Sequence, residues 1–174
     1  LIPGRIDTIT VTNTVPPTLL PVVINEWMAD NAGPGGFTDA MDGFFQDWFE
    51  LYNPNPTPVN LGGFHLTDSF ASPTKFQIPT NTIIAGQGFL LVWADENGGQ
   101  NSPTNADLHA SFKLSNGGEA IGLFGPDGIT PQHTITFGAQ IRNVSQGLYP
   151  DGAVGSVQFM TNWTPRAANR LGLP

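Results

Sequence analysis

Apolar and polar residues alternate over short stretches of this chain, most clearly in residues 47–52. There, Phe49 and Leu51 fall on one face of an extended segment, and Trp48 and Glu50 fall on the other. A period of two residues is that of a β-strand. Similar stretches predict further strands at residues 22–28, 63–67, 76–78, 110–114, 119–124, 134–137, 145–149 and 156–160.

Residues 88–94, GFLLVWA, are apolar at nearly every position instead of alternating. A strand that is apolar on both faces is covered on both sides, so this segment predicts a central strand. Together with the inward faces of the alternating strands, it predicts a core made of Phe49, Leu51, Phe64, Ile78, Leu91, Trp93, Leu123, Ile135 and Phe137.

Gly, Pro, Asn and Asp gather between the predicted strands, about every 8–12 residues. The dipeptide Asn116-Gly117 tolerates the positive φ angles of tight hairpin turns, and it predicts a hairpin between residues 110–114 and 119–124. About nine or ten short strands with regular turns and no convincing helix predict an all-β sandwich.

Composition supports this fold class. Of the 174 residues, 39% are apolar and only 11% charged, while 21 are Gly and 16 are Pro. Strands joined by many turns use such residues, whereas a helical bundle needs Ala, Leu, Glu and Lys. Residues 1–20, which include Val15-Pro16-Pro17, are interpreted as a linker or the tail of a preceding module, and residues 21–174 as the domain.

The charge balance excludes several kinds of partner. The net charge is −8, and the six Lys and Arg residues are scattered, so no cationic stripe for nucleic acid or anionic membranes is expected. No apolar run approaches the roughly 20 residues of a membrane span, so no membrane insertion is expected. Because cysteine is absent, disulfides and thiolate metal sites are excluded.

Nine segments, taken in order, resemble the lamin tail domain family, and the resemblance covers about residues 21–170. The segments are Ile24-Asn25-Glu26, DWFELYN at residues 47–53, LGGFHLTD at residues 61–68, FQIP at residues 76–79, IAGQ at residues 84–87, LVWA at residues 91–94, Ser102-Pro103-Thr104, GEAIGL at residues 118–123 and Ser145-Gln146-Gly147. The first two look most like the prokaryotic branch of the family.

The resemblance implies an immunoglobulin-like β-sandwich with no catalytic activity. Prokaryotic members are similar in being accessory modules of large exported or cell-surface proteins, so an extracellular or surface location in a bacterium is expected, with a protein or a cell-surface glycan as partner. No heptad coiled coil accompanies the domain here, so filament assembly is not implied.

The acidic residues suggest a metal site, and the histidines do not. His65, His109 and His133 show no metal-binding spacing and are interpreted as solvent-facing strand residues. In contrast, a Gly-rich loop offers the hard oxygen ligands that Ca²⁺ prefers. The candidate ligands are Asp30, Asp39, Asp42, Asp47 and Glu50, against the alternative of a solvated loop that uses Asp and Asn for its turns. No other cofactor is expected.

Two alternative functions remain open. Glu26 and Glu50 lie inside apolar strands and could be a glycosidase pair, although partners for half-buried carboxylates are the favoured interpretation. A carbohydrate-binding module, with or without calcium, would instead need an exposed platform of aromatic rings. Its candidates are Trp27, Trp48, Tyr52, Trp93 and Trp163, for which core packing is the default expectation.

Overall fold

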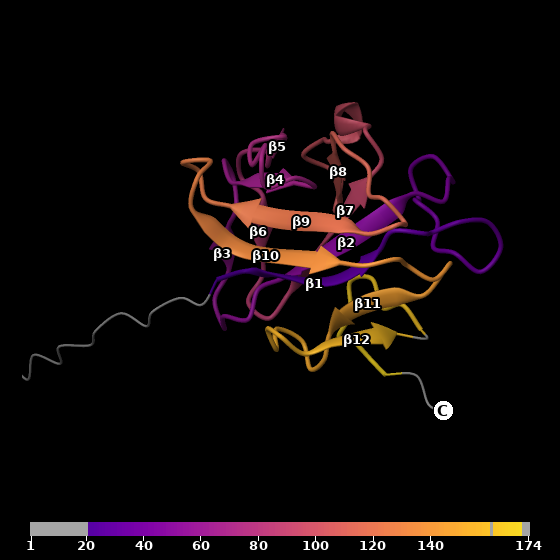
Figure 1. Cartoon of the computed structure of the whole chain (residues 1–174). Coiled ribbons are helices and arrows are strands. Elements are labelled where there is room, and N and C mark those ends of the chain that lie inside the picture. Colours follow the sequence, from indigo (N-terminus) through magenta and orange to yellow (C-terminus); the bar gives the residue numbers. More distant parts are fainter. Residues whose placement is uncertain (1–20, 161, 172–174) are drawn as a thin grey trace, which may run out of the picture.

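The computed structural model describes residues 21–160 and 162–171 (Figure 1). Twelve strands and one short 3₁₀ helix occur in these ranges. The prediction of an all-β sandwich is therefore confirmed. The predicted linker at residues 1–20 lies outside the described residues.

The larger sheet has six strands in the order β12-β11-β1-β2-β7-β8. Neighbouring strands are antiparallel except for β7 and β8, which are parallel. Its members are β1 (Val23–Met28), β2 (Asp47–Tyr52), β7 (Phe89–Ala94), β8 (Leu108–Ala110), β11 (Ser145–Leu148) and β12 (Val157–Met160).

A four-stranded sheet, in the order β10-β9-β4-β5, packs against the larger one, with β9 and β10 close to β1. It contains β4 (His65–Thr67), β5 (Phe76–Gln77), β9 (Glu119–Phe124) and β10 (Pro131–Phe137). Two short strands, β3 (Val59–Asn60) and β6 (Ile83–Ile84), pair separately, and the 3₁₀ helix η1 spans Gly98–Gln100.

The main core fills the space between the two sheets. Five predicted core residues are buried there: Phe49, Leu51, Ile78, Leu123 and Phe137. Two more, Phe64 and Ile135, are only partly buried and pack against this core. Most of the predicted core is thus confirmed, because strand alternation assigns faces correctly wherever one face meets a partner sheet.

Strand β7 is covered on both faces, as its continuous apolar sequence predicts. Leu90 and Val92 point into the main core, whereas Leu91 and Trp93 join Met28 and Trp48 in a second cluster. This second cluster lies on the opposite, outer face of the six-stranded sheet, where Phe37 and Trp163 cover it. Leu91 and Trp93 are therefore buried as predicted, but they belong to a different packing layer.

The predicted Asn116-Gly117 hairpin is wrong. A turn does form there, since the Gly118 N–H donates to the Ser115 carbonyl over 3.2 Å. However, β8 before the turn pairs with β7, and β9 after it pairs with β4 and β10. The turn thus connects the two sheets. The turn residues determine the local backbone angles, whereas packing in the core determines which strands pair.

Candidate functional site

The loop between β1 and β2, residues 29–46, carries three of the five acidic side chains that the sequence singled out, Asp30, Asp39 and Asp42, whereas Asp47 and Glu50 lie in β2. Within it, the Asp39 N–H donates to the Phe44 carbonyl, and the Gly43 N–H donates back to the Asp39 carbonyl. One carboxylate oxygen of Asp39, Oδ1, accepts from the Met41 N–H at 2.8 Å. These bonds fold the Asp39 side chain inward, where it is 1% exposed.

Asp39 lies close to two residues from the neighbouring strands β7 and β8. Asp95 directly follows β7, and His109 lies in the parallel strand β8. His109 Nδ1 lies 2.7 Å from Asp95 Oδ2 and 3.8 Å from Asp39 Oδ2. We call these three buried residues the Asp39 cluster; their ligand atoms all lie within 4.8 Å of one another.

Neighbouring groups hold the cluster in place. Asp95 Oδ1 accepts from the Asn97 N–H at 2.9 Å. The Asn101 side chain bonds both the N–H and the carbonyl of His109. Burial raises the pKa of Asp39, and the nearby charges of Asp42 and Asp95 raise it further, while His109 opposes the shift.

The other four predicted ligands make separate contacts. The Asp30 carboxylate lies 3.7 Å from Arg142 Nε, and Asp42 accepts from the Phe44 N–H and from Gln100. Asp47 accepts from the Asn31 N–H, and burial raises its pKa to about 6. Glu50 contacts the C-terminal segment described below. Of the five predicted calcium ligands, Asp39 alone belongs to the Asp39 cluster. Calcium binding by this loop stays a prediction.

Glu26 and Glu50 face each other across β1 and β2, and both are fully buried on the outer face of the sheet. The C-terminal segment, residues 162–171, covers them. Glu26 accepts from the Ser145 hydroxyl at 2.5 Å and from the backbone and hydroxyl of Thr164 at 3.0–3.2 Å. Glu50 accepts from the Arg166 N–H.

Glu26 therefore has the partners that the sequence favoured, whereas Glu50 is bonded through one oxygen, and its Oε2 has no hydrogen-bond partner among the described residues. Burial, reinforced by the charge of Glu26, raises the pKa of Glu50 to about 9, so Glu50 is protonated at neutral pH. An ion pair also holds the C-terminal segment, because the Arg166 guanidinium pairs with Asp107. The Asp107 carboxylate also accepts a hydrogen bond from Trp93 Nε1.

The prediction that the three histidines face solvent is wrong. His65, His109 and His133 are all buried, at 8%, 0% and 9% exposed. His133 Nδ1 accepts from the Ile24 N–H at 3.1 Å, which fixes it as an acceptor, and burial lowers its pKa. The sequence missed His109 as a cluster member because the residues that surround it come from distant parts of the chain.

The tryptophans pack in the interior of the domain, as expected from the sequence. Trp27, Trp48 and Trp93 are at most 1% exposed, and Trp163 is partly buried against the outer cluster. Tyr52 packs on Phe89, with ring centroids 4.9 Å apart. These rings therefore stabilise the sandwich and form no exposed platform.

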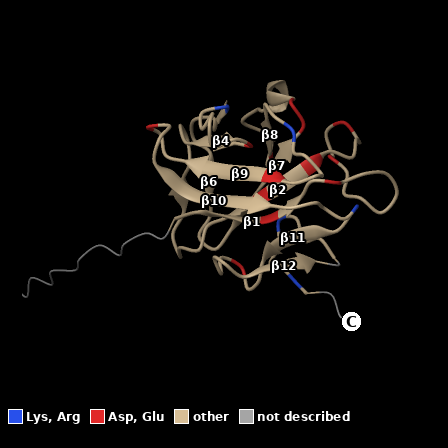
Figure 2. Ribbon diagram, in the orientation of Figure 1, with Lys and Arg blue, Asp and Glu red and all other residues tan. Residues whose placement is uncertain are grey.

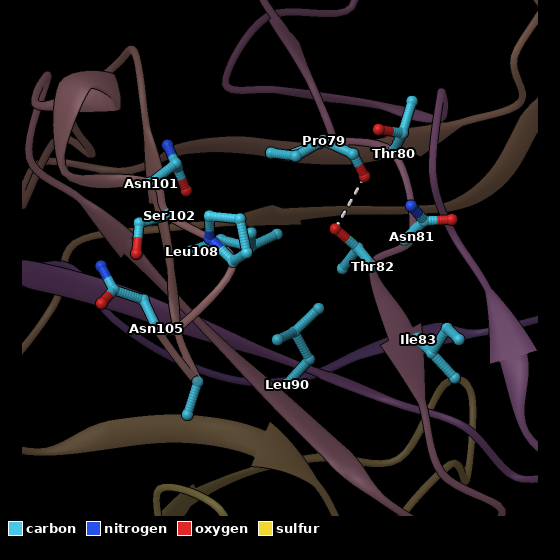
Figure 3. Close-up of a pocket in the computed structure, with 12 residues that line it drawn as sticks. Pro79, Thr80, Asn81, Thr82, Ile83, Leu90, Asn101, Ser102, Asn105 and Leu108 are labelled. Carbon is cyan, nitrogen blue, oxygen red and sulfur yellow. Dashed lines mark hydrogen bonds between the residues drawn. The ribbon is translucent and has the colours of Figure 1, made fainter.

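The surface also carries a pocket of about 570 Å³ (Figure 3). Asn101, Ser102 and Asn105 line it from one loop, and residues 79–83 line it from the other side. Leu90 and Leu108 lie among these polar groups. None of the lining residues is charged or aromatic, and neither buried glutamate reaches the pocket.

Acidic residues lie within β1 and β2 and on the neighbouring loops, whereas Lys and Arg are few and separated in the described part of the chain (Figure 2). No helix within residues 21–160 or 162–171 is long and apolar enough to cross a membrane. The two packed sheets define a β-sandwich domain.

The sequence model of the Lamin Tail Domain family matches residues 16–139, and the chain belongs to that family. This family is one of non-catalytic immunoglobulin-like domains. Comparison with curated proteins found no match. The matched region ends before β11, so β11 and β12 complete the six-stranded sheet from outside it.

Proposed function

We propose that this domain is a non-catalytic interaction and structural module of a larger exported or cell-surface bacterial protein. Membership of the family supports a role in interaction, and the resemblance of the INE and DWFELYN segments to the prokaryotic branch supports the bacterial surface setting. The partner we favour is a protein.

The β1–β2 loop supports this choice through an exposed apolar tip, consisting of Met41, Phe44 and Phe45. These side chains are 52%, 63% and 38% exposed. Large apolar groups gathered on one loop mark interaction surfaces. Figure 1 shows the loop projecting from one end of the sandwich, where a partner can approach it.

The loop that presents the tip is held by internal bonds. The Asn31 amide donates to the carbonyls of Phe37 and Gln46, and its oxygen accepts from the Phe37 N–H. The Asp39 turn closes the loop nearer its tip. A preorganised apolar surface loses less conformational entropy on binding than a mobile one does.

Site-specific crosslinking tests this surface. A photoreactive phenylalanine analogue at position 44, in the full-length protein in its own cells, is expected to crosslink to one defined protein. The same analogue at position 129 is the matched control, because Ile129 is 77% exposed but lies in the β9–β10 turn. Equal crosslinking from both positions, or none from position 44, would contradict the proposal.

Glycan binding is a second candidate, and the polar pocket favours it. The amide of Asn81 can hydrogen-bond sugar hydroxyls, and Leu90 and Leu108 supply apolar contact. Calcium is not required by this pocket, since no carboxylate lines it. Binding on a glycan array that Asn81→Ala abolishes would support this candidate over the protein-binding one.

The hydrolase alternative predicts turnover of a substrate, whereas the non-catalytic proposal predicts none. Glu26 and Glu50 are 0% exposed beneath the C-terminal segment, so we expect no turnover of glycans, esters or phosphodiesters by the isolated chain. Turnover that disappears in Glu50→Gln would overturn the non-catalytic proposal.

A further inference from the structure

We propose that Asp39, Asp95 and His109 bind one divalent transition-metal ion, with Zn²⁺ as the ion that fits best. Two carboxylate oxygens and an imidazole nitrogen form a mixed oxygen and nitrogen donor set. Imidazole and carboxylate are both ordinary Zn²⁺ ligands, whereas Ca²⁺ takes six to eight oxygen ligands. The Asp39 cluster therefore differs in kind from the calcium loop that the sequence suggests.

The spacing of the donor atoms suits such an ion. Ligand atoms about 2.0–2.2 Å from an ion lie about 3.4 Å apart in a tetrahedral arrangement. His109 Nδ1 lies 2.7 Å from Asp95 Oδ2 and 3.8 Å from Asp39 Oδ2, on either side of that value. Both His109 distances are thus within 1 Å of the tetrahedral spacing, and all three donor atoms lie within 4.8 Å of one another.

An unpaired oxygen inside the cluster provides independent support. Asp39 Oδ2 is buried and has no hydrogen-bond partner among the described residues. A proton on His109 Nδ1 is directed to Asp95, which is 1.1 Å closer than Asp39. Buried polar atoms normally have a partner, and a cation between the three groups would provide one for Asp39.

The charges lead to the same conclusion. Two buried carboxylates beside one imidazole carry negative charge that burial makes costly. A divalent ion balances two carboxylates with a neutral histidine. The Asn97 N–H already orients the Asp95 carboxylate, as outer groups do at metal sites, and the Asn101 side chain fixes the backbone of His109.

Binding would connect three separate parts of the molecule. Asp39 belongs to the β1–β2 loop, Asp95 follows β7, and His109 lies in the edge strand β8. A bound ion would fix the loop, and with it the apolar tip, to the sheet. This consequence rests on the proposed function, whereas metal binding itself does not.

The test uses the 174-residue chain after treatment with EDTA, titrated with ZnCl₂, MnCl₂, CaCl₂ and MgCl₂ by calorimetry. We expect one Zn²⁺ per chain, a higher melting temperature with Zn²⁺, and weaker effects from Ca²⁺ and Mg²⁺. Asp39→Asn is expected to weaken Zn²⁺ binding by at least about tenfold. Asp30→Asn, in the same loop but beside Arg142, is the matched control and should bind Zn²⁺ as the native chain does.

Histidine NMR keeps the proposal falsifiable if a variant fails to fold. In the native chain, Zn²⁺ should shift the ring nitrogen signals of His109 and leave those of His65 and His133 in place. No Zn²⁺ binding by the folded chain, equal binding by Asp39→Asn, or no shift at His109 would each overturn the proposal. Binding of Ca²⁺ alone would also overturn it and would favour the calcium loop. A failure of the crosslinking experiment would leave the metal site unaffected.

Discussion

The two faces of the six-stranded sheet are buried in different ways. The inner face meets the second sheet through an apolar core that includes Phe49, Leu51 and Leu123. The outer face also has an apolar cluster, but beside it lie the buried Glu26 and Glu50 beneath the C-terminal segment. One sheet is thus covered by hydrophobic packing on its inner side, and by an apolar cluster together with two buried glutamates on its outer side.

The inner face should give the largest effect. Phe49 is fully buried there, so Phe49→Ala is expected to reduce the free energy of unfolding by about 3–5 kcal/mol through lost contacts and a cavity. Denaturant melts measure it. Phe159, which is 47% exposed on β12, is the control, and Phe159→Ala should change stability by no more than about 0.5 kcal/mol. A loss below about 1 kcal/mol for Phe49→Ala would contradict the face assignment.

The outer face should respond to pH through Glu50. Its pKa is about 9 in the folded chain and 4.5 in its ordinary state, so the folded state binds more protons than the unfolded state between these values. Stability contributed by this group is therefore complete below about pH 4.5 and is lost as pH rises towards 9.

Glu50→Gln should flatten the dependence of unfolding free energy on pH over that window. Asp47 provides the matched comparison, because its pKa of about 6 places its loss of stability between pH 3.8 and 6. Asp47→Asn should thus alter only the lower part of the curve. Melts in urea at a series of pH values distinguish the two, and an unchanged slope in Glu50→Gln would show that Glu50 is ionised in the fold.

A smaller effect is expected at Thr164. Its hydroxyl donates to Glu26 at 3.0 Å, and Thr164→Val removes that donor while keeping the side-chain shape. We expect a loss of about 1–2 kcal/mol in the free energy of unfolding, since Glu26 keeps its bonds to Ser145 and the backbone. Thr130→Val, at an exposed turn, serves as the control. Equal losses in the two variants would mean that the C-terminal segment contributes little to the outer face.

The sequence alone supplied the fold class, most strand positions and the residues of the inner core. Alternation at Phe49 and Leu51 and the apolar run at residues 89–94 were sufficient, because a strand's two faces are fixed by a period of two. It did not supply the short strands β3, β6 and β8, which contain two or three residues and show no period.

The candidate site was only partly accessible from sequence. Asp39 was proposed as a metal ligand from the composition of its loop, but its meeting with Asp95 and His109 was not predicted. Asp95 lies 56 positions and His109 lies 70 positions further along the chain. Their meeting depends on β7 and β8 pairing in parallel, and no local pattern in either segment specifies that pairing.

The sequence by itself determined which residues form strands, which faces of those strands are apolar, and that the chain belongs with the lamin tail domains. Only the tertiary structure decided that Leu91 and Trp93 pack in a separate outer layer, that Glu26 and Glu50 hold the C-terminal segment, and that His109 is buried beside two carboxylates. The physical reason is the sequence separation over which each effect acts, since alternation and turn chemistry depend on only a few consecutive residues. The burial of a charged group depends on segments that folding brings from more than 100 positions away, as it does for Glu26 and Thr164.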